Sequence, residues 1–92
     1  MYKVVRSKKY KRDLRRLVRS GRFNMSKLEE ILGELKSNRP LPYVCQNHKL
    51  HGIGGNVWEC HIEPDLLLVY KKLEGILVLY LLRVGSHNDL FG

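Results

Sequence analysis

The main change in hydrophobic periodicity along the sequence falls at segment 38–42, and this change limits the folds open to the chain. Before that segment, apolar residues recur at helical spacing, and after it they alternate with polar residues as strands do. Each proline of Asn38-Arg39-Pro40-Leu41-Pro42 lacks an amide donor and disfavours helix in the residue before it. A helical half followed by a strand half predicts an α+β fold.

The first half predicts a short strand and two amphipathic helices. Tyr2 to Arg6 is rich in strand-forming residues, Ser20-Gly21 is a helix stop, and Ser26-Lys27-Leu28-Glu29 has the form of a capping box. The apolar stripe of the first helix comprises Tyr10, Leu14, Leu17 and Val18. That of the second helix comprises Met25, Leu28, Ile31, Leu32 and Leu35. We expect both stripes to be buried in the core, since an amphipathic helix buries its apolar face.

The second half predicts three or four strands, because side chains alternate between the two faces of a strand. In the first of them, Trp58, Cys60 and Ile62 are expected on the helix-covered face, with Val57, Glu59 and His61 on the other. Segments 66–72 and 76–84 predict two further strands joined by a hairpin near 73–75, and 86–92 is expected to be a short tail. The predicted domain, 1–92, is a β-α-α-β-β-β(β) chain with two N-terminal helices on one face of a mostly antiparallel sheet.

Charge is the first functional clue. Seventeen Lys and Arg against nine Asp and Glu give a formal charge of +8, and the isoelectric point is near 9.8. Ten of the basic residues precede Phe23, and Arg12, Arg15 and Arg16 are the candidates for binding phosphates there. A polyanion is therefore the expected partner. A solvated basic helix face, or one that docks an acidic protein segment, is the alternative.

Other broad classes are not expected from this sequence. The start of the chain lacks the long apolar stretch of a secretory signal, and the longest apolar run, 76–82, is far shorter than the roughly 20 residues of a membrane helix. A soluble cytoplasmic protein with no membrane association is expected. Cys45 and Cys60 are too few for a disulfide framework, so two reduced thiols are expected.

Histidines supply the candidate chemistry, since all four lie in the second half of the chain. Metal-independent RNA cleavage needs a base for the 2′-hydroxyl, an acid for the departing 5′-oxygen and a fixed cation for the phosphoryl oxygens. Histidine suits the first two roles and arginine the third. The candidate residues are His48, His61, Asp65, Arg83 and His87. A zinc site formed by His48, His51, His61 and Asp65 is the less favoured alternative, because no compact metal-binding motif supports it.

Several motifs together resemble the YafQ-type members of the RelE family of bacterial toxins. The motifs are His48-Lys49-Leu50-His51-Gly52, His61-Ile62-Glu63-Pro64-Asp65, Leu68-Val69-Tyr70-Lys71, Arg83-Val84-Gly85-Ser86-His87 and the ending Leu90-Phe91-Gly92. The resemblance spans almost the whole chain. The sequence departs from the YafQ pattern at Leu66, where the pattern has a tryptophan.

The resemblance implies a RelE-like fold and a ribosome-dependent mRNA endoribonuclease that a cognate antitoxin neutralises. It implies catalytic acid–base roles for His48, His61, Asp65 and His87, phosphate stabilisation by Arg83, and nucleotide contact by Phe91. His87 is the expected general acid. The base is His61 or Asp65, or Asp65 orients a neighbouring histidine.

The expected partners are mRNA, the ribosome and an acidic antitoxin. The free protein is expected to be a monomer without a cofactor, and to form a hetero-oligomer with the antitoxin. Two alternatives remain open: a ParE-like toxin that inhibits a topoisomerase without nuclease chemistry, and a basic nucleic-acid-binding module.

Overall fold

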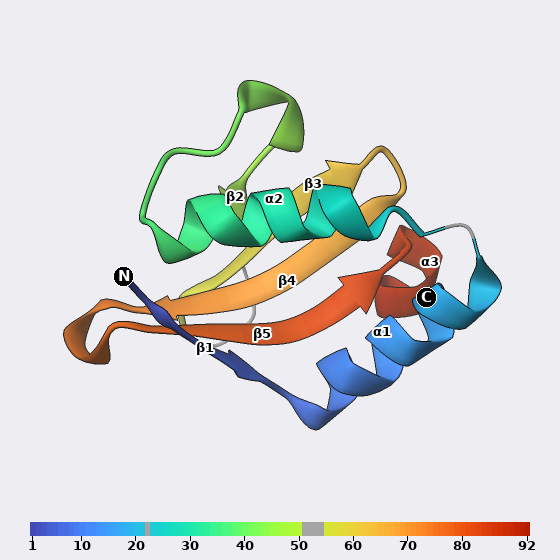
Figure 1. Cartoon of the computed structure of the whole chain (residues 1–92), viewed down its shortest axis with the longest axis horizontal. Helices are drawn as coiled ribbons and strands as arrows, with labels where there is room; N and C mark the ends of the chain where they lie inside the picture. Colours follow the sequence, from blue (N-terminus) through green and yellow to red (C-terminus); the bar gives the residue numbers. More distant parts are fainter. Residues whose placement is uncertain (22, 51–54) are drawn as a thin grey trace.

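The computed structural model describes residues 1–21, 23–50 and 55–92. It confirms the α+β class: helices and a five-stranded sheet in the order β1-β5-β4-β3-β2 (Figure 1). The strands are β1 (Lys3–Arg6), β2 (His48–Lys49), β3 (Val57–Glu63), β4 (Leu66–Leu73) and β5 (Val78–Gly85). The helices are α1 (Lys8–Ser20), α2 (Met25–Lys36) and α3 (His87–Phe91), with single 3-10 turns at Tyr43–Cys45 and Glu74–Ile76. Among the described strands, only the β1–β5 pair is parallel, so the sheet is mostly antiparallel, as predicted.

A core lies between the helices and one face of the sheet. Helix α2 crosses that face and buries Leu28, Ile31 and Leu35, while α1 contributes Tyr10 (Figure 1). Strand β3 supplies Cys60 and Ile62, with Trp58 packed against the cluster. The predicted faces of β3 are therefore confirmed, and His61 lies half-buried on the other face. Both cysteines are buried free thiols, and burial raises the pKa of Cys60 to about 12.

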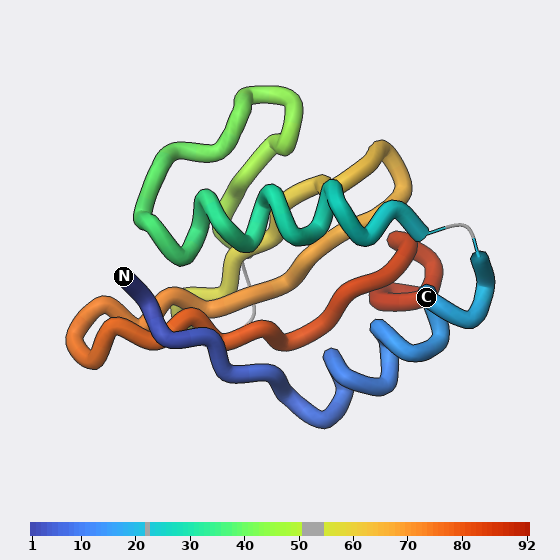
Figure 2. The backbone as a smooth tube through the Cα atoms, in the orientation of Figure 1, coloured from blue at the N-terminus to red at the C-terminus, as the bar shows by residue number. Residues whose placement is uncertain are grey.

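Helix α1 takes the place of β1 along the edge of β5. Strand β1 pairs with β5 only as far as Leu81, and then Ser7 donates from its hydroxyl to the Leu82 carbonyl at 2.8 Å. The same hydroxyl caps α1 by accepting from the amide of Tyr10. Figure 2 follows this path, from β1 beside β5 into α1, which ends near α3. The chain thus places its basic helix next to the C-terminal end of β5.

Three details of the helices differ from the prediction. Asn24, not Ser26, caps α2: its side chain accepts from the amide of Lys27 at 3.3 Å, and Ser26 donates to it from within the first turn. Val18 is 53% exposed and Met25 38% exposed, because each lies at the margin of its apolar stripe and not at its centre. Gly21 ends α1 as predicted, in the left-handed conformation that glycine tolerates.

Two further details concern the C-terminal half. Strand β5 begins at Val78 and not at residue 76, because the 3-10 turn and a left-handed Leu77 occupy the connection. The predicted tail is the short helix α3, which Ser86 and Asp89 start with a capping box. In the described residues no helix is long and apolar enough to span a membrane.

Candidate active site

Strand pairing aligns three of the charged or titratable residues in one row across the sheet. His48 of β2 lies opposite Glu59 of β3, Glu59 opposite Val69 of β4, and Val69 opposite Arg83 of β5. Directly paired residues point to the same face, so His48, Glu59 and Arg83 share the face that carries His61. With strands about 4.8 Å apart, the backbones at the two ends of the row are about 14 Å apart. A nucleotide can therefore lie between them.

His48 is held at both ring nitrogens. Its Nδ1 is 2.7 Å from the carbonyl oxygen of Gln46, and its Nε2 is 3.5 Å from a carboxylate oxygen of Glu59. The ring is half exposed, whereas the Glu59 side chain is only 8% exposed. The sequence placed Glu59 on the same face as His61 but assigned it no role. The structure makes it the acidic neighbour of a candidate acid–base group.

Arg83 is held by an aspartate of α1 that the sequence analysis missed. Its Nε and one Nη donate to the two carboxylate oxygens of Asp13, at 2.7 and 3.0 Å. The hydrogen bond with this buried carboxylate raises the pKa of Arg83, so the side chain stays charged. A signal for Asp13 exists in the sequence: it lies three residues after Tyr10 and four before Leu17, on the apolar stripe.

His87 lies at the start of α3, next to the β3–β4 turn. Its backbone amide is 3.4 Å from the Asp65 carboxylate, and its ring lies 5.3 Å from that of Phe91 at a tilt of 53°. His87, Asp65 and Phe91 are all exposed. His61 is in the next row of the sheet, paired through Leu67 with Gly85, two residues before His87. The five candidate catalytic residues thus come from β2, β3, the β3–β4 turn, β5 and α3, and they gather on one side of the sheet and at the end of β5.

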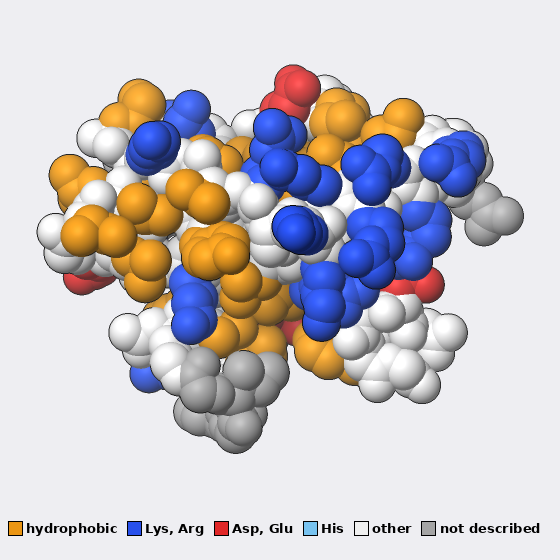
Figure 3. All heavy atoms as spheres, turned by 90° about the horizontal axis from the view of Figure 1, so that it is seen from below, with side chains coloured by type: hydrophobic (Ala, Val, Ile, Leu, Met, Phe, Trp, Pro, Cys, Tyr) orange, Lys and Arg blue, Asp and Glu red, His pale blue; other side chains and the backbone are white. Residues whose placement is uncertain are grey.

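The candidate phosphate-binding arginines lie on α1. Arg12, Arg15 and Arg16 are all exposed, and Figure 3 shows Lys and Arg side chains gathered on the side of the molecule where α1 lies. Arg16 differs from the other two because it is 3.4 Å from Asp13 and 3.9 Å from Asp89. Arg16 therefore links α1 to α3. Among the described residues, Arg12 and Arg15 form no ion pair with an acidic side chain.

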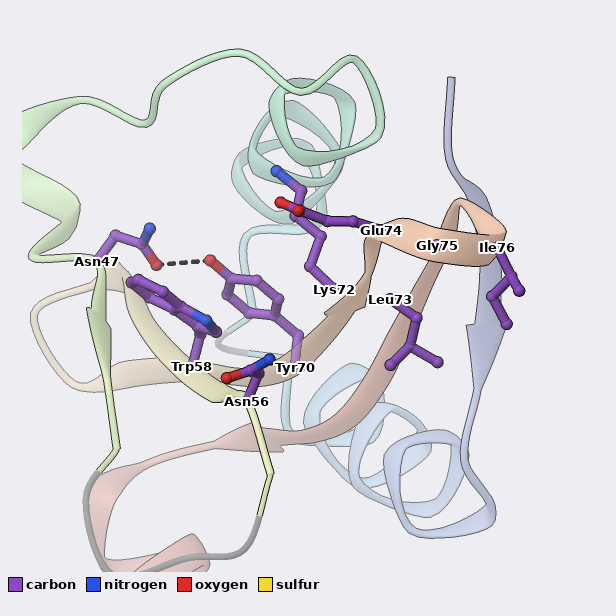
Figure 4. A pocket seen from close by; sticks show the side chains of 9 residues that line it. All are labelled: Asn47, Asn56, Trp58, Tyr70, Lys72, Leu73, Glu74, Gly75 and Ile76. Atoms are coloured by element: carbon purple, nitrogen blue, oxygen red, sulfur yellow. Dashed lines mark hydrogen bonds between the residues drawn. The ribbon is translucent and has the colours of Figure 1, made fainter.

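A cavity of about 640 Å³ adjoins these residues, between α1, the β3–β4 turn and α3. Arg16, Asp65 and Asp89 are among the residues that line it. A different cavity, of about 780 Å³, lies away from the candidate residues, beside the β4–β5 hairpin. Figure 4 shows Trp58 and Tyr70 there, with the Tyr70 hydroxyl donating to Asn47 at 2.6 Å. Trp58 and Tyr70 are on the face of the sheet opposite His61, so this cavity is separate from the site.

The zinc alternative gains no support from residues 1–21, 23–50 and 55–92. Within them, no three His, Cys, Asp or Glu side chains lie close enough together to hold a metal ion. His51, one of the four ligands of that alternative, lies outside the described residues.

Comparison with known proteins places the chain in a family. The model of the family described as "Bacterial toxin of type II toxin-antitoxin system, YafQ" matches residues 2–92. The mRNA interferase toxin YafQ of Escherichia coli K12 is 34% identical over 87 residues, which cover 94% of this chain and 91% of that protein.

Solved structures agree with this placement. A metal-bound toxin from Helicobacter pylori superposes with a TM-score of 0.93 at 40% identity, over 99% of this chain and all of the other. The YafQ chain of the Escherichia coli DinJ-YafQ complex does so with a TM-score of 0.88 at 30% identity, over the full length of both. The protein is thus a member of the YafQ family of toxins from bacterial type II toxin-antitoxin systems.

Proposed function

We propose that this toxin is an endoribonuclease that cleaves mRNA at the ribosome, by acid–base chemistry on the RNA's own 2′-hydroxyl. The observation that supports this most is the gathering of His48, His61 and Arg83 on one sheet face, with Asp65 and His87 at its border. The mRNA interferase activity named for the relatives is consistent with these residue types. Family membership also favours a nuclease over the ParE-like alternative.

The reaction needs a general base, a general acid and a cation that stabilises the phosphoryl oxygens, and these side chains supply all three. A base removes the proton of the 2′-hydroxyl, whose oxygen then attacks the adjacent phosphorus, and the bond from phosphorus to the 5′-oxygen breaks. His87 protonates that departing oxygen, and Arg83 stabilises the negative charge on the phosphoryl oxygens. His61 is favoured as the base, because an oxygen of Asp65 already lies beside the amide of His87. The products are a 2′,3′-cyclic phosphate and a 5′-hydroxyl.

The 2′-hydroxyl gives a direct test. An mRNA carrying a single 2′-deoxy nucleotide on the 5′ side of the cleaved bond should resist cutting on toxin-treated ribosomes. The same substitution one nucleotide further upstream is the control and should leave cleavage intact. Cleavage should also persist when a zinc-selective chelator is added with Mg²⁺ in excess to keep the ribosome assembled, since the proposed chemistry uses no metal. Cutting at the deoxy position, or loss of activity with the zinc-selective chelator and recovery on adding zinc, would refute this mechanism.

We also propose that the toxin's natural inhibitor is an antitoxin that is acidic where it contacts the toxin. The Escherichia coli relative forms a complex with DinJ, and the +8 charge of this chain favours an anionic partner. Such a segment would cover the face that carries His61 and Arg83 and compete with RNA for it. Association of the purified pair should slow as salt rises, and a rate indifferent to salt would contradict the proposal.

A further inference from the structure

Resting on the endoribonuclease function proposed above, we propose that Asp13 is a positioning residue for the reaction. It fixes the guanidinium of Arg83 so that the unbound edge of that group faces the scissile phosphate. The inference begins with the geometry of the pair. Nε to Oδ2 is 2.7 Å and Nη2 to Oδ1 is 3.0 Å, a forked contact in which both groups are charged.

The fork uses only one edge of the guanidinium. Arginine has five N–H donors, and this pairing occupies two of them. Three remain, on Nη1 and Nη2, and 29% of the Arg83 side chain is exposed. A phosphate can therefore bind to the other edge without displacing Asp13. Because the paired edge is fixed, the free edge keeps its direction before RNA arrives.

Asp13 is itself anchored to the strand that carries Arg83. Its Oδ2 also accepts the backbone amide of Val84 at 3.1 Å, where β1 no longer pairs with β5. The same carboxylate thus holds the main chain beside Arg83 and the end of the Arg83 side chain. Only 3% of the Asp13 side chain is exposed, so water competes little for these contacts.

Within α1, Asp13 also pairs with Arg16, but that contact is 3.4 Å long and the Arg16 side chain is 54% exposed, so it is weaker than the fork with Arg83. Asp13 is the sole acidic residue among the first 22, ten of which are basic. A buried carboxylate is costly unless paired, and an asparagine would suffice to accept the Val84 amide. The forked pair with Arg83 needs a carboxylate, since an amide accepts through one oxygen, and it is the shorter of the two ion pairs of Asp13. The placement of an acid here therefore points to the arginine.

A purely structural role makes a different kinetic prediction from a positioning role. If Asp13 acts through Arg83, its removal should matter only while Arg83 is present. If it merely anchors α1 to β5, its removal should cost the same with or without the arginine. A double-mutant cycle separates these cases. The variants are Asp13→Asn, Arg83→Ala and the two combined. Glu34→Gln is the control, because it makes the same charge change at an exposed ion pair with Arg39.

Single-turnover mRNA cleavage on ribosomes should show the coupling. We expect Asp13→Asn to lower the maximal rate by about tenfold to a hundredfold, with the half-saturating concentration unchanged or lower, because the variant has gained positive charge. In the Arg83→Ala background, the same change should cost less than about threefold. Glu34→Gln should behave as wild type. An undiminished rate in Asp13→Asn, or an equal loss in both backgrounds, would overturn the inference.

A second measurement on the wild-type protein does not depend on how the variants fold. In proton–nitrogen NMR spectra, the Nε–H of Arg83 should exchange with water much more slowly than that of exposed Arg12. Equally fast exchange would show that the forked pair does not persist. It would overturn the positioning role of Asp13 and leave the proposed endoribonuclease function untouched. Wild-type protein without RNA cleavage, or Arg83→Ala with full activity, would instead refute the proposed function, and the role of Asp13 with it.

Discussion

His48 and Glu59 form a pair between neighbouring strands, with Nε2 3.5 Å from a carboxylate oxygen that the fold almost completely buries. The second ring nitrogen of His48 contacts the Gln46 carbonyl at 2.7 Å. A ring with one polar partner on each side has a fixed orientation. Glu59 is therefore placed to orient His48, the candidate acid–base group, as a third residue orients the base in a nucleophile–base pair.

Replacing Glu59 with Gln should reduce RNA cleavage while the protein stays folded. The amide keeps the size of the side chain but removes the charge that faces His48. The loss of rate should be smaller than the roughly 10²–10⁴-fold that removal of an acid–base group itself causes. Glu29→Gln, at an exposed position of α2, is the matched control. Equal cleavage rates for the two variants would show that Glu59 has no part in the reaction.

Replacing His87 with Ala should abolish detectable cleavage and growth inhibition. The ring is exposed and contacts Phe91, so its loss should leave the core intact, while a missing general acid costs roughly 10²–10⁴-fold in rate. The neighbouring substitution Asn88→Ala, also exposed in α3, should leave toxicity unchanged. A folded His87→Ala protein that still arrests growth would exclude His87 as the acid.

The fold was largely predictable because periodicity reports which faces are buried. The alternation of Trp58, Cys60 and Ile62 placed β3 correctly, and Gly21 ended α1 where expected. The predicted N-cap of α2 was wrong because two neighbouring residues are equally suited to cap a helix. Asn24 and Ser26 are both good helix caps, and only the three-dimensional path of the chain selects Asn24.

The site was predictable in its residue types but not in its supporting contacts. Histidines and an arginine near strand ends are visible in the sequence, whereas the partners of His48 and Arg83 depend on pairing register and helix placement. Asp13 precedes Arg83 by 70 residues and meets it only because α1 replaces β1 at the edge of β5. The sequence alone indicates this long-range contact only through the position of Asp13, an acidic residue on the apolar stripe of α1.

The stability of the protein should fall above about pH 10, in part through Tyr70. Burial, and to a lesser extent the nearby Cys60, raises the pKa of this phenol, although its hydrogen bond to Asn47 opposes the shift. In the unfolded chain the phenol ionises near pH 10, so above that pH the unfolded state loses a proton that the native state keeps. The free energy of unfolding then falls by up to about 1.4 kcal/mol per pH unit for this one group.

Urea unfolding of Tyr70→Phe across alkaline pH measures this contribution. The variant should be less stable at neutral pH by roughly 0.5–1.5 kcal/mol, because it lacks the hydrogen bond to Asn47. Its stability should decline less steeply above pH 10, with the remaining slope due to groups such as Cys60. Tyr43→Phe, at a side chain that is 98% exposed, should match wild type. Identical alkaline slopes in all three proteins would contradict the role of Tyr70.

The arginines of α1 should govern RNA affinity through counterion release, and they should not contribute equally. Arg12 and Arg15 are exposed, and the described residues offer them no ion pair, so each is free to contact a phosphate. Arg16 already lies near Asp13 and Asp89, and a phosphate would have to compete with both carboxylates. Changing Arg12 or Arg15 to Gln should therefore lower the slope of log affinity against log salt by about one unit each.

Arg16→Gln should lower that slope by less, and Arg39→Gln, at an arginine paired with Glu34 outside α1, should leave it unchanged. The measurement is the affinity for ribosomes and for RNA from low to physiological salt. Equal, full-unit losses at Arg12, Arg15 and Arg16 would mean that Arg16 leaves its carboxylates to bind RNA. No change at any of the three would assign the basic face of α1 to the antitoxin, since the charge that the fold exposes there needs a polyanionic partner of one kind or the other.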